Sequence, residues 1–279
     1  MAPPLYRGRL APSPTGLLHL GHASTFREAQ LRAKTAEGTL LLRNEDLDPQ
    51  RSRQEFVDAM IEDLRWLGIN WQPPMISQSE RTALYRAFFD QLLQQGDVYP
   101  CQCSRKDLAG MMHAPHEDTD DEPVYPGTCR PIPDAQPQET PFRPDINYRF
   151  RVPDNVVVRF EDKNLGPQSF KAGIDFGDFL VWRKDGLPSY QLACVVDDAD
   201  TQITEVVRGR DLLKSTARQL LLQRALNLPS PAYFHTQLVT DELGVRLAKR
   251  HDALAIRTLR QQGLTPAEVL RMTTVTSDS

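Results

Sequence analysis

Short apolar segments alternate with amphipathic segments along the first hundred residues. Residues 6–11 lead into a turn rich in proline, serine and glycine, and residues 38–43 form an apolar run that ends in a charge. Between residues 49 and 67, apolar side chains recur every three or four positions, as they do on one face of a helix. This alternation of strand and helix predicts an α/β fold in which a parallel sheet carries helices on its faces.

Other segments extend this pattern in both directions along the chain. We expect helices over residues 21–36, after Ser79 up to Gly96, and over residues 212–226. The apolar run 193–196 is expected to form a buried core strand.

Proline marks a different kind of segment from residue 100 to about residue 155. Ten prolines in this stretch exclude a helical layer, because proline removes a backbone donor and clashes with the preceding turn. The acidic run 117–122 is expected to be a solvated loop, and residues 156–160 resemble a short strand. We therefore interpret roughly residues 100–200 as a separate module inserted into the α/β domain.

Composition places few limits on function. The 279 residues are 40% hydrophobic and 25% charged with a net charge of -4, which neither indicates nor excludes a nucleic-acid binder, since a basic patch can lie on an acidic protein. No run approaches the ~20 apolar residues of a membrane span. With no signal peptide visible, we expect a cytoplasmic protein, where clustered cysteines indicate a metal site before disulfides.

The first candidate site lies at the predicted turn from strand to helix, at residues 9–16 and 19–22. A helix N-terminus offers unpaired N–H groups to phosphate, and Gly21 allows close approach of a nucleotide. His19 and His22 can donate to phosphate oxygens as charge builds up in a transition state. The pattern alone is equally compatible with two surface histidines in a turn.

The second candidate site, residues 43–51, closes the apolar strand with a dense group of charges. Ligands collect at the carboxyl ends of strands in open α/β sheets, so Arg43 and Glu45 are the site candidates. We interpret Asp48 instead as the N-cap of a helix that begins at Pro49.

The third candidate site surrounds the expected strand 193–196, in which Cys194 is interpreted as a packing residue. Charged groups after a core strand again indicate a site at its end. The candidates are Tyr190, Asp197, Asp198 and Arg208.

The fourth candidate site is the basic segment 244–250, which follows a glycine. Such a loop can clamp a polyphosphate, with Lys249 acting as a point charge. Taken alone, the segment is better interpreted as a basic surface turn.

The fifth candidate site is a cysteine cluster in the proline-rich segment. Cys101, Cys103 and Cys129 suggest structural zinc, for which His113 or His116 is the expected fourth ligand on chemical grounds. Thiols without metal remain the alternative.

Taken together and in this order, the motifs resemble the glutamyl-tRNA synthetase branch of the class I synthetases over about residues 5–260. Arg9-Leu-Ala-Pro-Ser-Pro-Thr-Gly and His19-Leu-Gly-His22 resemble that branch's first strand and HIGH motif. Arg43-x-Glu-Asp-x-Asp-x-x-Arg51 resembles its amino-acid-binding segment, and Arg246-Leu-Ala-Lys-Arg its KMSKS loop. Tyr190 and Arg208 fall where the family places glutamate contacts.

The resemblance implies a Rossmann-like catalytic domain with an inserted zinc-bearing module. The expected divisions are residues 1–99 and 195–240 for the two catalytic halves, 100–194 for the inserted connective module, and 241–279 for the KMSKS-like loop and a short helical element. It also implies ATP-dependent activation of glutamate, with Mg²⁺ accompanying ATP.

The resemblance assigns roles to individual residues. His19, His22 and Lys249 would be catalytic. Glutamate would be bound by Arg9, Ala11, Ser13, Glu45, Tyr190 and Arg208. ATP would be bound by His19, Gly21, His22, Arg246 and Lys249. In the loop, Arg246 and Ala248 depart from the family's lysine and serine.

A short form of the family carries Cys-x-Cys and Tyr-x-x-x-Cys, as this chain does, and attaches glutamate to the queuosine base at the wobble position of tRNA(Asp). The resemblance to this glutamyl-queuosine form implies one Zn²⁺ per chain, with Tyr125 replacing histidine as fourth ligand beside Cys101, Cys103 and Cys129. It implies no membrane and no obligate protein partner. The alternatives are a catalytic fragment of an ordinary glutamyl-tRNA synthetase, in which an anticodon-binding region would follow, and a non-catalytic RNA-binding paralogue.

Overall fold

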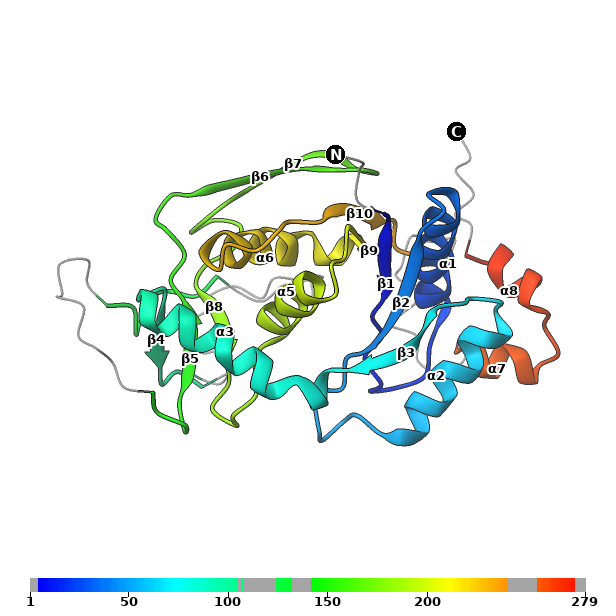
Figure 1. Ribbon diagram of the computed structural model, residues 1–279, viewed down its shortest axis with the longest axis horizontal. Helices are drawn as coiled ribbons and strands as arrows, with labels where there is room; N and C mark the ends of the chain where they lie inside the picture. The colour runs from blue at the N-terminus through cyan, green and yellow to red at the C-terminus, as the bar shows by residue number, and fades with distance from the viewer. Residues whose placement is uncertain (1–4, 105–106, 108–123, 132–141, 240–254, 274–279) are drawn as a thin grey trace.

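The computed structural model describes residues 5–104, 107, 124–131, 142–239 and 255–273. In Figure 1, the last two helices of the chain, drawn in orange and red, lie beside its first two helices on the right-hand side of the molecule. The first half supplies three parallel strands in the order β1-β2-β3, with Gly8 of β1 opposite Leu40 of β2. Their bounds are β1 Arg7–Leu10, β2 Thr39–Asn44 and β3 Gln72–Ser77.

The second half adds β9 and β10, which are also parallel. Strand β9 lies beside β1, because the Thr204 N–H at its start donates to the Arg7 carbonyl at 2.9 Å (Figure 1). The strand order therefore reverses between β1 and β9, the kind of position where open α/β sheets bind ligands. The bounds are β9 Glu205–Gly209 and β10 Ala232–Thr236.

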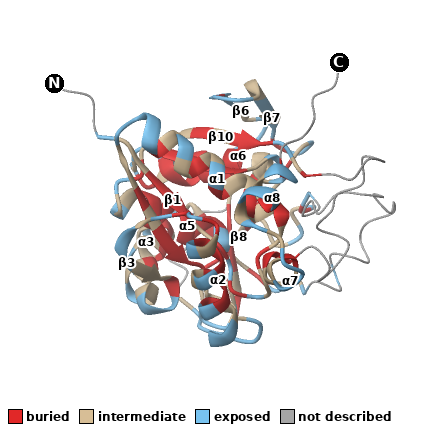
Figure 2. Ribbon diagram, turned by 90° about the vertical axis from the view of Figure 1, so that its right-hand side faces the viewer, coloured by how far each residue is buried: buried red, intermediate tan, exposed pale blue. Residues whose placement is uncertain are grey.

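Helices connect and cover these strands. Helix α1 buries the side of the helix that carries Leu20, Ala23 and Phe26, while α2 presents Met60 and Leu64 to the same core. Figure 2 shows this burial concentrated on the central strands and the inner sides of the helices. The bounds are α1 Leu20–Thr35, α2 Gln54–Trp66, α3 Thr82–Gln95, α5 Tyr190–Asp200, α6 Leu213–Ala225, α7 Ile256–Gln261 and α8 Pro266–Arg271.

An antiparallel part occupies the middle of the chain. Strands β4, β5 and β8 form one sheet, and β6 and β7 form a hairpin whose first strand also pairs with β10. The bounds are β4 Val98–Cys101, β5 Asn147–Phe150, β6 Val157–Asp162, β7 Gly166–Lys171 and β8 Phe179–Trp182. The expected divisions at residues 99, 194 and 240 stay predictions, and helix α5 runs across the second of them.

The structure corrects two local predictions. Residues 193–196 are not a strand but the middle of α5, which begins after Ser189, whose hydroxyl caps Leu192 N–H. Helix α5 packs against α3, α6 and β8, so it is apolar on several sides and its periodicity is hidden. Helix α2 begins at Gln54, so Asp48 caps no helix; its carboxylate accepts the Gln50 and Arg51 N–H groups in a turn.

The expected helices over 21–36, 79–96 and 212–226 are confirmed as α1, α3 and α6. Gly96 ends α3 in the left-handed conformation, as its position after an amphipathic run predicts. None of the helices that the structure describes is long and apolar enough to span a bilayer.

Candidate active site

A cavity of about 600 Å³ opens where β1 and β9 end and α1 begins. Nine of the residues selected from the sequence line it, although they come from four separate segments. They are Arg9, Ala11, Ser13, His19, Gly21, His22, Glu45, Tyr190 and Arg208.

The two histidines are fixed at the start of α1 by their own helix terminus. His19 Nδ1 accepts the Gly21 N–H at 3.1 Å, and His22 Nδ1 accepts the His19 N–H at 3.2 Å. Their ring centroids lie 3.9 Å apart. Because Nδ1 of each ring is an acceptor, the proton of the neutral ring is assigned to Nε2, so both side chains can act as donors. A Cβ on residue 21 would lie 2.9 Å from the His19 ring, which explains the glycine.

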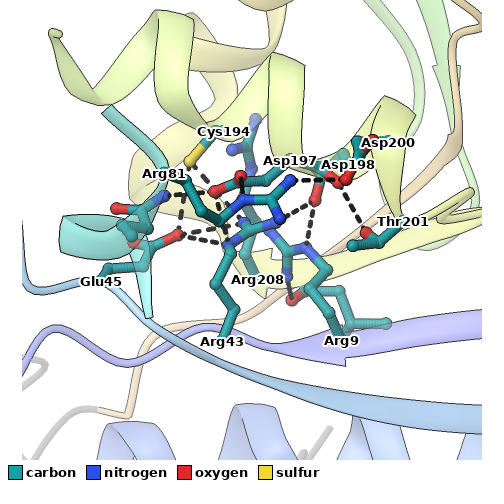
Figure 3. A network of polar contacts seen from close by, with 12 residues as sticks. Arg9, Arg43, Glu45, Arg81, Cys194, Asp197, Asp198, Asp200, Thr201 and Arg208 are labelled. Carbon is teal, nitrogen blue, oxygen red and sulfur yellow. Dashed lines mark hydrogen bonds and ion pairs between the residues drawn. The ribbon is translucent and has the colours of Figure 1, made fainter. Parts of the chain in front are cut away.

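A network of buried charges forms one wall of the site (Figure 3). Arg43 donates to Asp198 at 2.6 Å and to Glu45 at 3.0 Å, and Arg9 lies 3.4 Å from the same Asp198 oxygen. Burial opposes ionisation of Asp198, but Arg43 and Arg9 together lower its pKa. Asp198 is therefore a carboxylate that holds two arginines in place.

The same surroundings shift the pKa of Glu45 in the opposite direction. Burial raises its pKa, and the attraction of Arg43 and Arg9 only partly offsets this. The Cys194 thiol donates to the same carboxylate at 3.4 Å. Because Glu45 lines the cavity, a ligand ammonium next to it would stabilise its charged form.

Asp197 belongs to the scaffold behind the cavity. Its carboxylate is fully buried and accepts hydrogen bonds from Gln78, Arg81 and Tyr85 at 2.8–3.0 Å. Arg81 also pairs with Asp200 at 2.6 Å. These contacts tie α5 to the start of α3, and Asp197 does not line the cavity.

Arg208 is held by neutral groups. Its nitrogens donate to Thr216 at 2.7 Å, to His235 at 3.3 Å and to Tyr190 at 3.4 Å. Within the described part of the chain, no carboxylate lies within 4.0 Å of its guanidinium, and only 4% of the residue is exposed. A buried cation without a paired anion is costly unless a ligand supplies the anion.

The cysteine cluster lies away from this cavity, at the end of β4. The sulfurs of Cys101, Cys103 and Cys129 all lie within 4.8 Å of one another. The Tyr125 hydroxyl lies 3.5 Å from the Cys101 sulfur and 3.6 Å from that of Cys103. Ligands at ~2.1–2.3 Å from a tetrahedral zinc would be separated by roughly 3.6–3.8 Å. The four groups therefore fit one zinc ion.

The surroundings act differently on these groups: burial raises the pKa of the Cys103 thiol and of the Tyr125 hydroxyl, whereas the pKa of Cys129 is lowered. Burial alone would raise the pKa of Cys129, but hydrogen bonds from Tyr125, the Gln102 backbone and the neighbouring thiols lower it to about 7. The Cys129 N–H donates to the Tyr125 oxygen at 2.8 Å, which leaves that oxygen an acceptor. His113 and His116, the ligands expected on chemical grounds, lie outside the described residues.

The chain matches a family model and is similar to known proteins. A family model for the catalytic domain of class I tRNA synthetases (E and Q) matches residues 6–276. The chain is 45% identical over 272 residues to the glutamyl-Q tRNA(Asp) synthetase of Symbiobacterium thermophilum, covering 94% of this chain and 84% of that relative. It belongs to the class I tRNA synthetases of this family.

Two further relatives are similar to most of this chain. A glutamyl-Q tRNA(Asp) synthetase of Nitratidesulfovibrio vulgaris is 45% identical over 95% of this chain and 84% of its own length. Glutamate--tRNA ligase 2 of Nitrosococcus oceani is 40% identical over 92% of this chain and 56% of its own length. As a member of this group of synthetases, the chain is a ligase.

A solved glutamate tRNA ligase from Elizabethkingia meningosepticum, in complex with its amino acid, superposes with a TM-score of 0.74 at 28% identity. The match covers 88% of this chain and 52% of the ligase, so the chain spans about half the length of that structure. The family and this structure confirm the predicted fold class, a class I synthetase catalytic domain.

Arg246 and Lys249 of the synthetase's KMSKS-like segment lie outside the described residues, and their roles stay predictions. The sequence did not reveal His235 and Thr216, which contact Arg208, or Asp162, which contacts His235. No motif marks them, since they come from β10, β6 and α6.

Proposed function

We propose that the chain uses ATP to activate glutamate and then transfers it to the queuosine base at the wobble position of tRNA(Asp). The observation that carries the glutamate part is Arg208, a buried cation at the cavity wall whose described contacts are neutral. The similarity to synthetases named for glutamyl-Q tRNA(Asp) supports the acceptor.

The cavity has complementary groups for both ends of glutamate. Arg208 would pair with the side-chain carboxylate by two parallel hydrogen bonds, the arrangement that gives arginine its geometric selectivity. Glu45 would take the ammonium, and Arg9 the α-carboxylate. Ala11, Ser13 and Tyr190 line the same wall and would set the shape of the subsite.

The first step needs no general base, because the α-carboxylate is already ionised at pH 7. A carboxylate oxygen attacks the α-phosphorus of ATP, the bond to the β-phosphate oxygen breaks, and pyrophosphate leaves with the electron pair. His19 and His22 would donate from Nε2 to the phosphates as charge builds up, and Gly21 would admit them to the start of α1. Lys249 and Arg246 would add cationic charge, and Mg²⁺ would accompany ATP.

In the second step, a hydroxyl oxygen of the modified base attacks the adenylate carbonyl. The bond to phosphate breaks, AMP leaves, and the hydroxyl proton passes to solvent. The cysteine cluster would hold one Zn²⁺ through Cys101, Cys103, Tyr125 and Cys129, in a structural role away from the reaction.

A paired assay tests the proposal. Glutamate-dependent exchange of pyrophosphate into ATP should occur without tRNA, and labelled glutamate should then pass to tRNA(Asp) that contains queuosine. The same tRNA lacking queuosine should accept none. Equal charging of queuosine-free tRNA(Glu) would instead identify an ordinary glutamate–tRNA ligase activity, as in the Nitrosococcus oceani relative.

A further inference from the structure

The contacts behind Arg208 form a chain of groups that ends on a buried carboxylate. His235 of β10 lies opposite Arg208 of β9 in the parallel register, so both side chains project from the same face. His235 Nε2 accepts from Arg208 Nε at 3.3 Å, and its Nδ1 lies 2.6 Å from Asp162 Oδ2. Both His235 and Asp162 are almost completely buried.

The hydrogen bonds determine which nitrogen of His235 carries the proton. Asp162 accepts the backbone N–H groups of Asn164, Leu165 and His235 at 2.9–3.3 Å, and these donors help to lower its pKa against the effect of burial. An ionised carboxylate has no proton to donate, so His235 Nδ1 must be its donor. Nε2 is then the acceptor for Arg208, as its position requires.

His235 is also uncharged in the neutral pH range. Burial, followed by the charge of Arg208, lowers its pKa to about 4, even though Asp162 acts in the opposite direction. Thr216 completes the arrangement, because its hydroxyl lies 3.0 Å from His235 Nε2 and accepts from Arg208 at 2.7 Å. Arg208 is therefore aligned by acceptors that do not neutralise it.

Two neighbouring arginines, Arg9 and Arg43, differ from Arg208 in having a carboxylate as a direct partner. Arg9 and Arg43 lie 3.4 and 2.6 Å from the Asp198 carboxylate, whereas Arg208 interacts with Asp198 only beyond ion-pair distance. A carboxylate in the place of His235 would compensate Arg208 in the same way and would weaken its attraction for an incoming anion.

We propose that His235, oriented by Asp162, is a positioning residue that keeps Arg208 aligned without a carboxylate paired to it, so that the cavity accepts a carboxylate in preference to its amide. The inference deepens the proposed function and rests on Arg208 as the group that recognises the side chain of glutamate. Glutamate is then favoured over glutamine because only the acid supplies the missing negative charge.

Asp162→Asn is the sharpest test, because it changes hydrogen-bonding direction and little else. The amide oxygen can still accept the three backbone N–H groups, but its NH₂ would face His235 Nδ1. His235 would then carry its proton on Nε2, where it opposes the Arg208 N–H. We expect the KM for glutamate in pyrophosphate exchange to rise about 10- to 100-fold, as for the loss of a charge-assisted hydrogen bond. The KM for ATP and kcat should change less than about threefold by the same reasoning.

A pair of His235 variants separates positioning from packing. His235→Gln places an amide oxygen near the position of Nε2 and should keep the glutamate KM within about fivefold of wild type. His235→Ala removes that acceptor and should resemble Asp162→Asn, with a reduced preference for glutamate over glutamine. Melting temperatures of all variants show whether each one folds.

The outcomes separate the two proposals. Wild-type exchange that depends on glutamate, together with an unchanged glutamate KM in Asp162→Asn, would overturn the positioning role alone. Equal rises in the KM for ATP and for glutamate would also overturn it, because they indicate general damage to the site. Wild-type protein without glutamate-dependent exchange would overturn the proposed function and this inference with it.

Discussion

Arg149 donates a hydrogen bond from Nε to the sulfur of Cys101 at 3.3 Å, and its guanidinium lies 4.0 Å from the centre of the Tyr125 ring. A buried cation thus contacts two of the four groups expected to hold zinc. Three thiolates and a phenolate around one Zn²⁺ would carry more negative charge than the ion neutralises, and Arg149 would balance part of it. No sequence motif indicates this contact, because β5 lies far from the cysteines along the chain.

The first prediction concerns this cluster. Protein purified without chelators should contain about one equivalent of zinc, the usual content of a four-ligand structural site. Cys129→Ser should lose the metal, and Arg149→Gln should retain it but release it about 10- to 100-fold more readily to a chelator. Metal analysis by mass spectrometry measures both. Cys194→Ser, which alters a cysteine outside the cluster, is the matched control and should keep its zinc.

Metal-free wild-type protein would contradict the zinc prediction outright. Full retention of zinc by Tyr125→Phe would be a narrower result, since it would remove only the fourth ligand from the assignment.

The second prediction concerns Arg208. Replacing it with leucine leaves the glutamate side-chain carboxylate without its partner, a loss typically worth about 3–5 kcal/mol, or roughly 100- to 5000-fold in binding. Arg208→Lys restores the charge without the planar fork and should recover only part of the affinity. The matched control is Arg224→Leu, on the exposed side of α6, which should behave as wild type. Unchanged glutamate dependence in Arg208→Leu would reject the assignment.

Local patterns explain why much of the site could be predicted. The turn after β1, the histidines at the start of α1 and the charges after β2 lie where strand and helix meet, and a sheet collects such ends at one edge. Cys101 and Cys103 are close in sequence, so the cysteine cluster could also be predicted. In each case the residues that act together lie within a few positions of one another or at equivalent strand ends.

The rest of the fold and of the site depends on contacts between distant segments, which no local sequence pattern indicates. Residues 193–196 were expected to be a strand, because an apolar run of four residues has no period that separates a strand from a buried helix. The alignment of His235 with Arg208 depends on the register of β10 against β9. The position of Asp162 beside His235 depends on the pairing of β6 with β10. These registers are set by the packing of the whole sheet.

The third prediction concerns Lys249, which lies outside the described residues and is assigned from the sequence. A cation that strengthens its interaction only in the transition state lowers the barrier without tightening substrate binding. Lys249→Ala should therefore reduce kcat for exchange by about 10²- to 10³-fold, with a much smaller change in the KM for ATP. Arg246→Lys should be mild, since a cation is kept. A Lys249→Ala enzyme with normal kcat and a raised KM would make the residue a binding group instead.

The fourth prediction concerns Asp63, a carboxylate of α2 buried in the protein interior. The residue is fully buried, and neither side-chain oxygen has a hydrogen-bond partner in the part of the chain that the structure describes. Burial raises its pKa from 3.8 to about 6, and the charge of Arg257 opposes this only in part. Burial therefore favours the protonated form of Asp63 in the folded protein.

The effect of Asp63 on stability follows from this raised pKa. Because the pKa is higher in the folded state, the contribution of Asp63 is fully present below about pH 4 and is lost as the pH rises through about 6. A shift of about two pKa units corresponds to roughly 3 kcal/mol. Asp63→Asn cannot ionise, so its free energy of unfolding should exceed that of wild type by up to this amount at pH 8. At pH 4 the two proteins should differ little.

Urea unfolding of wild type and Asp63→Asn at pH 4, 6 and 8 measures this difference directly. Asp58→Asn is the control, because Asp58 lies on the exposed side of the same helix and should show no comparable gain at any pH. A gain of equal size at pH 4 and pH 8 would assign the effect to packing and not to ionisation. A loss of stability at pH 8 would show instead that the Asp63 carboxylate is stabilised where it lies.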